Sequence, residues 1–343
     1  GNPRQESRVI ARLLEGVPRR GLAMLAALLV LLLAFPLFAS GYLLAIGFLI
    51  LYFAFVGQAW NIMMGFAGQL SLGHSLYVGL GAYAAAALYV HFGLSPWIGL
   101  LASVGTCALA GAVIGFLAFR FGVAGVYFAI LTIAFAEFAR IGFDHFAWVR
   151  GSSGLFLPVS NYTQNDLWNL RGSPRMFYYL MLALTAGAFV LCHALLRSRM
   201  GYYWLAIRES PEAAQALGVN IFRYKMVAVV VSAAMTSVGG VVYAFYYNNL
   251  FPEQIFHISR SIELILGPII GGIGTLVGPL VGALLLAGLA ESLRELMLRF
   301  GIDLPGVKQV FYGLCLLLVV VFLPNGVWPP LARALRLERK VKR

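Results

Sequence analysis

Charged residues are scarce in this sequence: Asp, Glu, Lys and Arg together make up 11% of its 343 residues. A soluble domain has about 25% charged and about 45–50% apolar residues. Here 61% of the residues are hydrophobic, which is too many and too evenly spread for a soluble core or a single anchor. Because one spanning helix needs about 20 apolar residues, the chain has room for roughly ten spans. The alternation typical of outer-membrane barrel strands is absent, so we predict an all-α polytopic membrane protein.

Cysteine is also rare, and no metal-binding pattern occurs. Cys107, Cys192 and Cys315 each lie in apolar surroundings without a partner at a useful spacing. This pattern is typical of buried small hydrophobic residues. His74 has no second histidine or carboxylate at metal-ligand spacing. We therefore expect no disulfide framework, no metal and no cofactor.

The motifs of energy-transducing chemistry are missing as well. The sequence has no Gly-x-x-x-x-Gly-Lys-Ser/Thr phosphate loop, so an ATPase that drives transport would be another chain. It also lacks the series of membrane carboxylates that a proton relay requires. We therefore expect neither an ATPase site nor a proton relay on this chain.

One serine motif provides an enzymatic alternative. Gly151-Ser152-Ser153-Gly154 matches the Gly-x-Ser-Gly of intramembrane serine proteases. That chemistry needs the serine at the start of a buried helix and a histidine on a neighbouring helix. Here the serines lie in a polar loop between Arg150 and Pro158. An intramembrane protease is therefore the least favoured interpretation.

The net charge of +12 would suggest nucleic-acid binding if the protein were soluble. In this chain the basic residues concentrate in the N-terminal segment, one central loop and the tail, which follows the positive-inside rule and favours anionic lipid. The expected partner is a lipid bilayer and not a nucleic acid. We predict a cytoplasmic segment 1–20, a permease domain 21–325 with an external loop 143–175 and a cytoplasmic loop 197–225, and a cytoplasmic tail 326–343.

Apolar runs and turn residues predict about ten spans, broken by glycine-rich segments, with both termini cytoplasmic. Residues 21–40 are too long for a cleavable signal peptide and indicate an anchor. The piece 258–271 is short, and a re-entrant arrangement of it would lower the count to eight or nine. The predicted spans cover 21–40, 42–63, 75–91, 95–119, 123–142, 176–196, 226–247, 258–271, 276–298 and 306–323.

A glycine-rich stretch, Gly65–Tyr83, interrupts the apolar pattern with five glycines. Glycine is unfavourable inside a helix, so this density predicts a broken or closely packed backbone. At membrane depth, irregular backbone survives only when it is buried in protein or lines a water-filled cavity. We therefore predict helix-end and interface groups of a translocation path. The residues assigned to this path are Gly68, Gln69, Ser71, Gly73 and His74.

A second glycine-rich segment has a similar spacing. Gly271-x-x-Gly274 leads into Gly278 and Gly282, as Gly65-x-x-Gly68 leads into Gly73 and Gly79. Each follows an inward crossing and opens an outward one, which would make a parallel repeat. Packing of small residues between helices is the other interpretation. The predicted path extends to Gly271, Gly272 and Gly274.

Ionisable residues inside spans are candidate functional groups. Glu137 lies three residues before Arg140, and the two either pair with each other or form a gate or a partner contact. Glu263 lies in the short piece 258–271 without an obvious neighbour. Glu137 and Glu263 are both assigned to the predicted path.

The central loop encodes a short helix outside the membrane. Ser210 is a good N-cap, Pro211 suits the first helical position, and Gly218 is a stop signal. The helix is either a solvated connector or a rigid peg that docks into a soluble partner. We favour the peg because of the spacing Glu212-Ala213-Ala214-x-x-x-Gly218.

That spacing resembles the cytoplasmic coupling loop of permease subunits of ATP-binding-cassette (ABC) importers. Three further stretches, Gly65–Tyr83, Leu131–Glu137 and 261–283, are similar to the high-affinity branched-chain amino acid permeases. Of the two paired permeases in that family, the segment Arg208–Val219 with Arg223-Tyr224-Lys225 is more similar to the M-type subunit. The resemblance implies that ATPase coupling involves Arg208, Glu209, Glu212, Ala213, Ala214 and Gly218.

The same resemblance implies a complete importer in the bacterial inner membrane. Its other components would be an H-type permease subunit as the heterodimer partner, two cytoplasmic ATP-binding subunits and a periplasmic substrate-binding protein. The implied cargo is a branched-chain amino acid. Urea and short-amide permeases are similar in the same glycine-rich blocks, so these cargos are the alternative.

Overall fold

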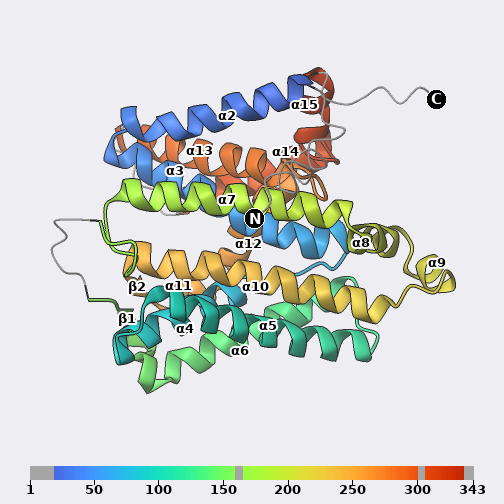
Figure 1. The fold of residues 1–343 in the computed structure, drawn as a ribbon, viewed down its shortest axis with the longest axis horizontal. Coiled ribbons are helices and arrows are strands. Elements are labelled where there is room, and N and C mark those ends of the chain that lie inside the picture. The colour runs from blue at the N-terminus through green and yellow to red at the C-terminus, as the bar shows by residue number, and fades with distance from the viewer. Residues whose placement is uncertain (1–18, 159–164, 300–305, 336–343) are drawn as a thin grey trace, which may run out of the picture.

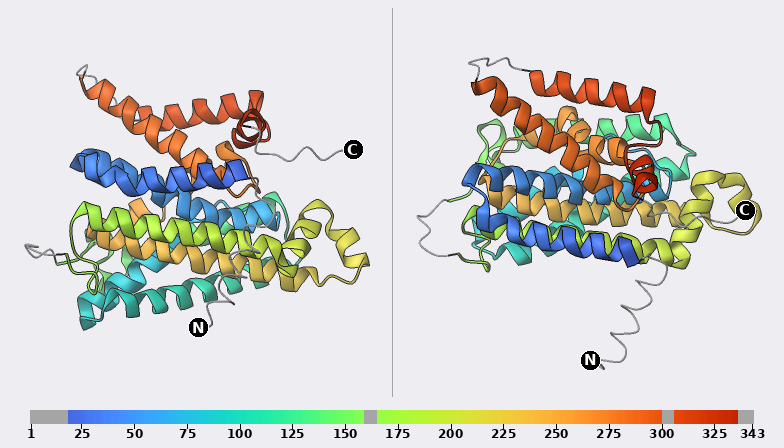
Figure 2. Two further views of the ribbon diagram at one scale, coloured as in Figure 1. Left: turned by 45° about the horizontal axis from the view of Figure 1, so that its top comes forward. Right: turned by 90° about the horizontal axis from the view of Figure 1, so that it is seen from above.

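The computed structural model describes residues 19–158, 165–299 and 306–335. Most of the basic N-terminal segment, the end of the basic tail and part of the external loop, all predicted from the sequence, lie outside these residues. The described residues form long helices that run roughly along one common axis (Figure 1). Figure 2 shows α13 and α14 on one side of α3, with α5 on the opposite side of the bundle.

Long helices alternate along the chain with shorter helices, turns and two short strands. The first half contains α2 (Arg19–Phe38), α3 (Gly41–Asn61), the π-helical turn η1 (Ile62–Phe66), α4 (Ser75–Phe92), α5 (Pro96–Arg120), α6 (Val126–His145), the 3-10 turns η2 (Ala147–Val149) and η3 (Gly151–Ser153), and β1 (Leu155–Phe156). The second half contains α7 (Pro174–Arg197), α8 (Arg199–Glu209), α9 (Pro211–Ala216), α10 (Ile221–Tyr247), β2 (Asn249–Leu250), α11 (Pro252–Ile255), α12 (Ile258–Gly271), α13 (Gly278–Arg299), α14 (Val307–Phe322) and α15 (Trp328–Ala334).

Six helices within the described ranges are long and apolar enough to cross a membrane: α3 continued by η1, α4, α5, α6, α7 and α10. The apolar parts of α2 and α14 are shorter, and α12 has 14 residues. The all-α polytopic membrane fold is therefore confirmed. The count of ten spans and the cytoplasmic termini stay predictions.

Helices α3, α4 and α10 form the centre of the bundle. In α3 and α10, 67% of the residues in the apolar segment are buried, against 28% in α5, α6 and α7. The buried run is continuous from Leu51 to Asn61 in α3. A helix that is apolar all round and buried is a core helix, whereas α5, α6 and α7 leave apolar faces for lipid or for another protein.

The two ends of the bundle carry different elements. Strands β1 and β2 pair antiparallel, with Leu155 opposite Leu250, and they join the loop after α6 to the end of α10. Figure 1 places this strand pair at one end of the bundle and α8 with α9 at the other. The loops predicted to be external and cytoplasmic thus lie at opposite ends.

Candidate functional site

The two glycine-rich segments meet near the end of the bundle that carries α8. The first glycine segment, residues 67–74, connects η1 to α4, and the second glycine segment, residues 272–277, connects α12 to α13. A methyl group placed on Gly65 would lie 2.7 Å from the backbone nitrogen of Gly274. We call this approach of Gly65 to Gly274 the glycine contact. It brings together two stretches that are about 210 residues apart in the chain.

Two amide side chains of α3 fasten the second glycine segment. Asn61 accepts a hydrogen bond from Gly274 N (2.8 Å) at Oδ1 and donates one from Nδ2 to Thr275 O (2.9 Å). Gln58, about one turn earlier, donates to Leu276 O. Irregular backbone at membrane depth leaves N–H and C=O groups without helical partners, and these amides satisfy three of them.

Arg208, at the end of α8, bonds into the glycine contact from the loop that is predicted to be cytoplasmic. Its Nη1 donates to Gly65 O at 2.6 Å, and its Nη2 bonds to Glu209 Oε1 at 2.9 Å. Gly68 and Gly274 leave room for this side chain. A methyl group on Gly68 would lie 3.0 Å from Arg208 Cγ, and one on Gly274 would lie 2.5 Å from Arg208 Nη1. Both glycines also have positive φ, 70° and 79°. Only glycine combines that backbone with so little volume.

Helix α8 is firmly attached to the bundle, whereas α9 projects from it. Trp204 is fully buried and donates from Nε1 to Tyr224 O (2.8 Å) in α10. In the loop helix α9, Glu212 is exposed, and Leu217, the first residue after the helix, is 87% exposed. Figures 1 and 2 show α9 standing out from the end of the bundle. Helix α9, the exposed peg, is therefore connected through α8 to Arg208, whose side chain lies at the glycine contact.

The sequence predicted the start and end of this peg correctly. The Ser210 hydroxyl accepts from Ala213 N at 3.3 Å, Pro211 is the first helical residue, and Gly218 has a φ of 84°. The separate helix α8 before it was not predicted. Of the other residues assigned to coupling, Glu209 pairs with Arg208, and Ala214 is the buried residue of the peg itself.

The first glycine segment is mostly packed rather than open, since five of its eight residues are buried. Trp60 Nε1 donates to Ser71 O at 2.8 Å, and Gln69 Nε2 donates to Ala67 O at 2.8 Å. The Thr132 hydroxyl of α6 accepts from the backbone of both Leu72 and Gly73, at 3.1 and 3.2 Å. A methyl group on Gly73 would overlap the Thr132 carbonyl. Thr132 belongs to the Leu131–Glu137 stretch that carried part of the family resemblance.

His74 ties this segment to α10. Its Nδ1 lies 3.3 Å from Ser71 Oγ, and its Nε2 lies 3.2 Å from Ser232 Oγ. The Ser232 hydroxyl already donates its proton to Ala59 O at 2.6 Å, so it accepts from His74. Nε2 therefore carries a proton, and in the neutral ring Ser71 donates to Nδ1. His74 has the geometry of a buried structural link.

Helix α12 is attached to the start of α4 by a pair of serines. Ser261 Oγ accepts from Ser75 N at 2.9 Å and donates to Ser75 Oγ at 2.7 Å, while Ser75 Oγ donates to Phe256 O. All of these groups are buried. These bonds connect α12, which leads into the second glycine segment, directly to α4.

The predicted carboxylates lie toward the opposite end of the bundle from α8. Glu137 pairs with Arg140 at 2.6 Å, as the spacing predicted, and Arg140 also pairs with Glu253 of α11. The prediction that Glu263 has no obvious neighbour was wrong, because Arg260, three residues earlier on α12, pairs with it at 3.0 Å. A role of either carboxylate in a path stays a prediction.

The protease motif does not form a catalytic pair. Ser152 and Ser153 are exposed in the turn η3. Nearby, the imidazole of His91 bonds to Trp148 O at 2.8 Å, and that of His145 lies 2.9 Å from Ile141 O. No group of three potential metal ligands occurs among the described residues.

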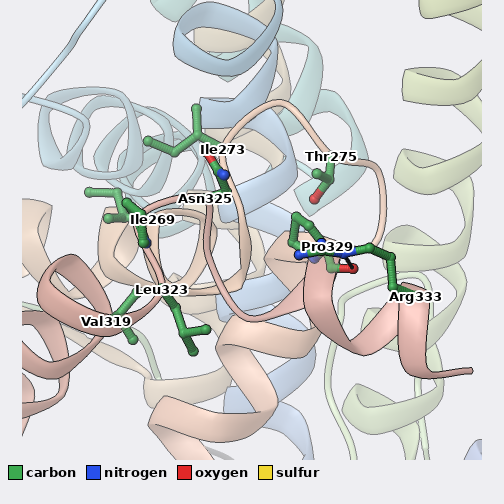
Figure 3. A pocket seen from close by; sticks show the side chains of 9 residues that line it. Ile269, Ile273, Thr275, Val319, Leu323, Asn325, Pro329 and Arg333 are labelled. Atoms are coloured by element: carbon green, nitrogen blue, oxygen red, sulfur yellow. Dashed lines mark hydrogen bonds between the residues drawn. The ribbon is translucent and has the colours of Figure 1, made fainter.

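A pocket of about 600 Å³ lies beside the second glycine segment and was not predicted from the sequence. Figure 3 shows side chains from the end of α12, the loop after α14 and α15 around it, with Thr275 near Pro329 and Arg333. Val327 N donates to Ile270 O at 2.8 Å and attaches this part of the chain to α12. The pocket therefore borders the element that Arg208 contacts.

Several residues of this site escaped the sequence analysis. Asn61, Gln58, Thr132 and Ser232 are polar residues inside apolar helices, and each bonds to backbone of another segment or to His74. Polar side chains in membrane helices commonly join helices in this way. The presence of these polar residues inside apolar spans could have marked them as candidates. The sequence gives no indication of the groups that they bond to.

Three features together define a membrane permease. They are a buried core of apolar helices, two helical hairpins interrupted by glycine segments, and a peg connected to the point where these hairpins meet. The sequence matches the family described as branched-chain amino acid transport system / permease component over residues 42–320. This match covers well over half of the chain, and the protein belongs to that family.

Individual relatives agree with this assignment. The chain is 29% identical, over 92% of its length and 76% of the relative's, to the high-affinity branched-chain amino acid transport system permease protein LivM of Escherichia coli (strain K12). It is 28% identical to the LivH permease protein of Salmonella typhimurium over 52% of both chains. It is also 28% identical to the nucleoside ABC transporter permease protein NupC of Lactococcus lactis over 36% of this chain and 37% of that one. No solved structure matches the chain.

Proposed function

We propose that this chain is the M-type permease subunit of an ABC importer that carries branched-chain amino acids across the bacterial inner membrane. The observation that carries the proposal is the bond from Arg208 of the cytoplasmic loop to Gly65 O at the glycine contact, in a chain of the branched-chain amino acid permease family. A loop that reaches the point where two broken membrane helices meet is suited to transmit movement to both.

The proposed mechanism uses that loop as a lever. Two cytoplasmic ATP-binding subunits close on ATP and press on α9, and α8 transfers the displacement through Arg208 to the glycine contact. The hairpins α3–α4 and α12–α13 then rock about their glycine segments, which is a hinge-like transition between two packed states. ATP hydrolysis takes place on the partner subunits and not on this chain.

The partners complete the importer. The similarity to LivH permease proteins over half of the chain supports an H-type permease as the other half of a heterodimer. A periplasmic binding protein docks at the end of the bundle that carries β1 and β2. In this arrangement the chain has ten spans with both termini cytoplasmic, and α12 completes the count as the short inward span.

Cargo uptake tests the proposal directly. The chain is expressed with its neighbouring transporter genes, and the purified complex is placed in proteoliposomes with its binding protein and ATP. We expect uptake of leucine, isoleucine and valine to exceed that of urea, acetamide and a nucleoside by at least about tenfold. Preferred uptake of urea or the amide would replace the cargo with the alternative named above, and uptake of none would refute the function.

The docking of α9 gives a second expected result. Reversing the charge of Glu212, which is exposed in the first turn of α9, should weaken binding of the ATP-binding subunits by at least about tenfold, because opposed like charges at an interface cost several kcal/mol. Co-purification and titration of the ATPase onto the Glu212→Arg variant measure this. Arg199→Glu, an exposed reversal at the start of α8, is the matched control. Unchanged binding by Glu212→Arg would exclude α9 as the docking peg.

A further inference from the structure

A charged pair on α12 has no part in the coupling mechanism. Arg260 Nη1 bonds to Glu263 Oε2 at 3.0 Å, and Arg260 Nη2 donates to Tyr243 OH at 2.8 Å. The guanidinium also lies over the Tyr243 ring, 4.9 Å from its centre. Both charged side chains remain 18% exposed, so they border the surface of the bundle while most of each is covered.

Tyrosines surround this pair and leave polar atoms unsatisfied. Tyr52 of α3 is fully buried, with its ring centre 5.8 Å from that of Tyr243, and the ring centre of Tyr247 lies 4.5 Å from that of Tyr243. Within the described part of the chain, neither the Tyr52 hydroxyl nor Arg260 Nε has a hydrogen-bond partner. A buried hydroxyl without a partner costs free energy, and such groups in native structures call for an explanation.

The pair lies among the membrane helices, toward the end of the bundle that carries β1 and β2, with Arg260 the third residue of α12. Tyr243 is one turn before the end of α10, and Tyr52 is eleven residues into α3. Ionisable residues inside membrane segments are costly and usually mark a substrate or ion path. A buried ion pair is also weak evidence for stability, because apolar residues of the same volume often serve as well or better. Stability alone therefore gives little reason for this pair.

We propose that Arg260 and Glu263, with Tyr52, Tyr243 and Tyr247, form a transient site for a zwitterionic α-amino acid on the translocation path. The substrate carboxylate binds the Arg260 guanidinium, whose planar fork suits carboxylates. The substrate ammonium binds Glu263 and the faces of the tyrosines. This proposal rests on the proposed function and specifies how its cargo is recognised.

The exchange of partners explains why the site would select a zwitterion. Opening the Arg260–Glu263 pair exposes one charge of each sign, and only a ligand that carries both charges satisfies both without leaving a net charge in the membrane. A neutral amide or urea satisfies neither charge fully, and a singly charged ligand leaves the other unmatched. Because the ligand replaces an existing pair, binding is weak and reversible, which suits passage rather than storage.

The experiment compares two double variants in the complete importer with leucine as the probe. Arg260→Gln/Glu263→Gln removes both charges together, so that no unpaired charge is buried. Arg260→Glu/Glu263→Arg keeps an ion pair but reverses it. The control, Glu295→Gln/Arg299→Gln, removes an exposed pair of α13 that has a separation of 2.6 Å. Subunit co-purification, basal ATP hydrolysis and leucine uptake are measured for each.

We expect both double variants at residues 260 and 263 to co-purify with the partner subunits and to keep basal ATP hydrolysis, while leucine uptake falls at least about tenfold. The control should stay within twofold of the wild type. Uptake within twofold in either double variant would overturn the proposal, and so would failure of both to assemble, since that outcome assigns the pair to folding. Absence of leucine uptake by the wild-type complex would instead refute the proposed function, and this site with it.

Discussion

Replacing Arg208 with methionine is expected to lower amino acid uptake by about tenfold to a hundredfold and to leave assembly of the importer intact. Arg208 donates to Gly65 O at 2.6 Å, and Gly274 lies against the same guanidinium nitrogen. A hydrogen bond from a charged group contributes about 1.5–3 kcal/mol, which corresponds to roughly a tenfold to hundredfold change in an equilibrium. Methionine keeps an unbranched, flexible stem in place of the guanidinium-bearing side chain but loses both the charge and the donors.

The loss should affect coupling more than folding. The Arg208 side chain is 33% exposed, and α8 is attached independently by the buried Trp204. The peg also has its own cap from Ser210. The variant complex should therefore assemble and hydrolyse ATP, but less of that hydrolysis should drive transport.

Parallel assays of leucine uptake and ATP hydrolysis in proteoliposomes measure the number of ATP molecules used for each leucine. That number should rise in Arg208→Met and rise less in Arg208→Lys, which retains a charge but not two separated donors. Arg199→Met, an exposed arginine at the start of the same helix, should match the wild type. A normal ratio in Arg208→Met would rule out this side chain as the link between the peg and the hairpins.

Local rules predicted much of the fold because they depend on neighbours in the sequence. The cap at Ser210, the early proline at Pro96 and the pair Glu137–Arg140 all follow from spacings of one helical turn or less. The same spacing rule would have found Arg260 as the partner of Glu263. Apolar runs of sufficient length predicted helices in the right places for the same reason.

The site itself could be predicted only in part. Glycine density indicated two irregular segments, and both occur, yet nothing in the spacing of residues indicated that Gly65 approaches Gly274. The Asn61 amide fits the second glycine segment 213 residues further along the chain, and the Arg208 bond to Gly65 spans 143 residues. Such contacts follow from how whole helices pack, which periodicity alone does not determine.

The packing of α12 against α13 gives the other large expected effect. A methyl group on Gly271 would overlap the carbonyl of Gly278, and one on Gly282 would overlap the carbonyl of Gly267. These are backbone atoms, so no side-chain rotation relieves the overlap. Gly278 is also held in place, because its N–H donates to Thr275 Oγ1 at 3.0 Å. The two helices approach this closely only because each presents glycine.

Gly271→Val should therefore destabilise the protein by about 3 kcal/mol or more, at the upper end of the usual cost of overpacking. Thermal midpoints from heated size-exclusion chromatography, together with the yield of monodisperse protein, measure the loss. Gly105→Val is the matched control, because Gly105 lies inside α5 with no atom within 4 Å of an added methyl group, so it makes the same substitution in an α-helix without the overlap. An equal effect of the two substitutions would mean that α12 and α13 separate without cost, and the second glycine segment would then be too loosely held to receive the movement of Arg208.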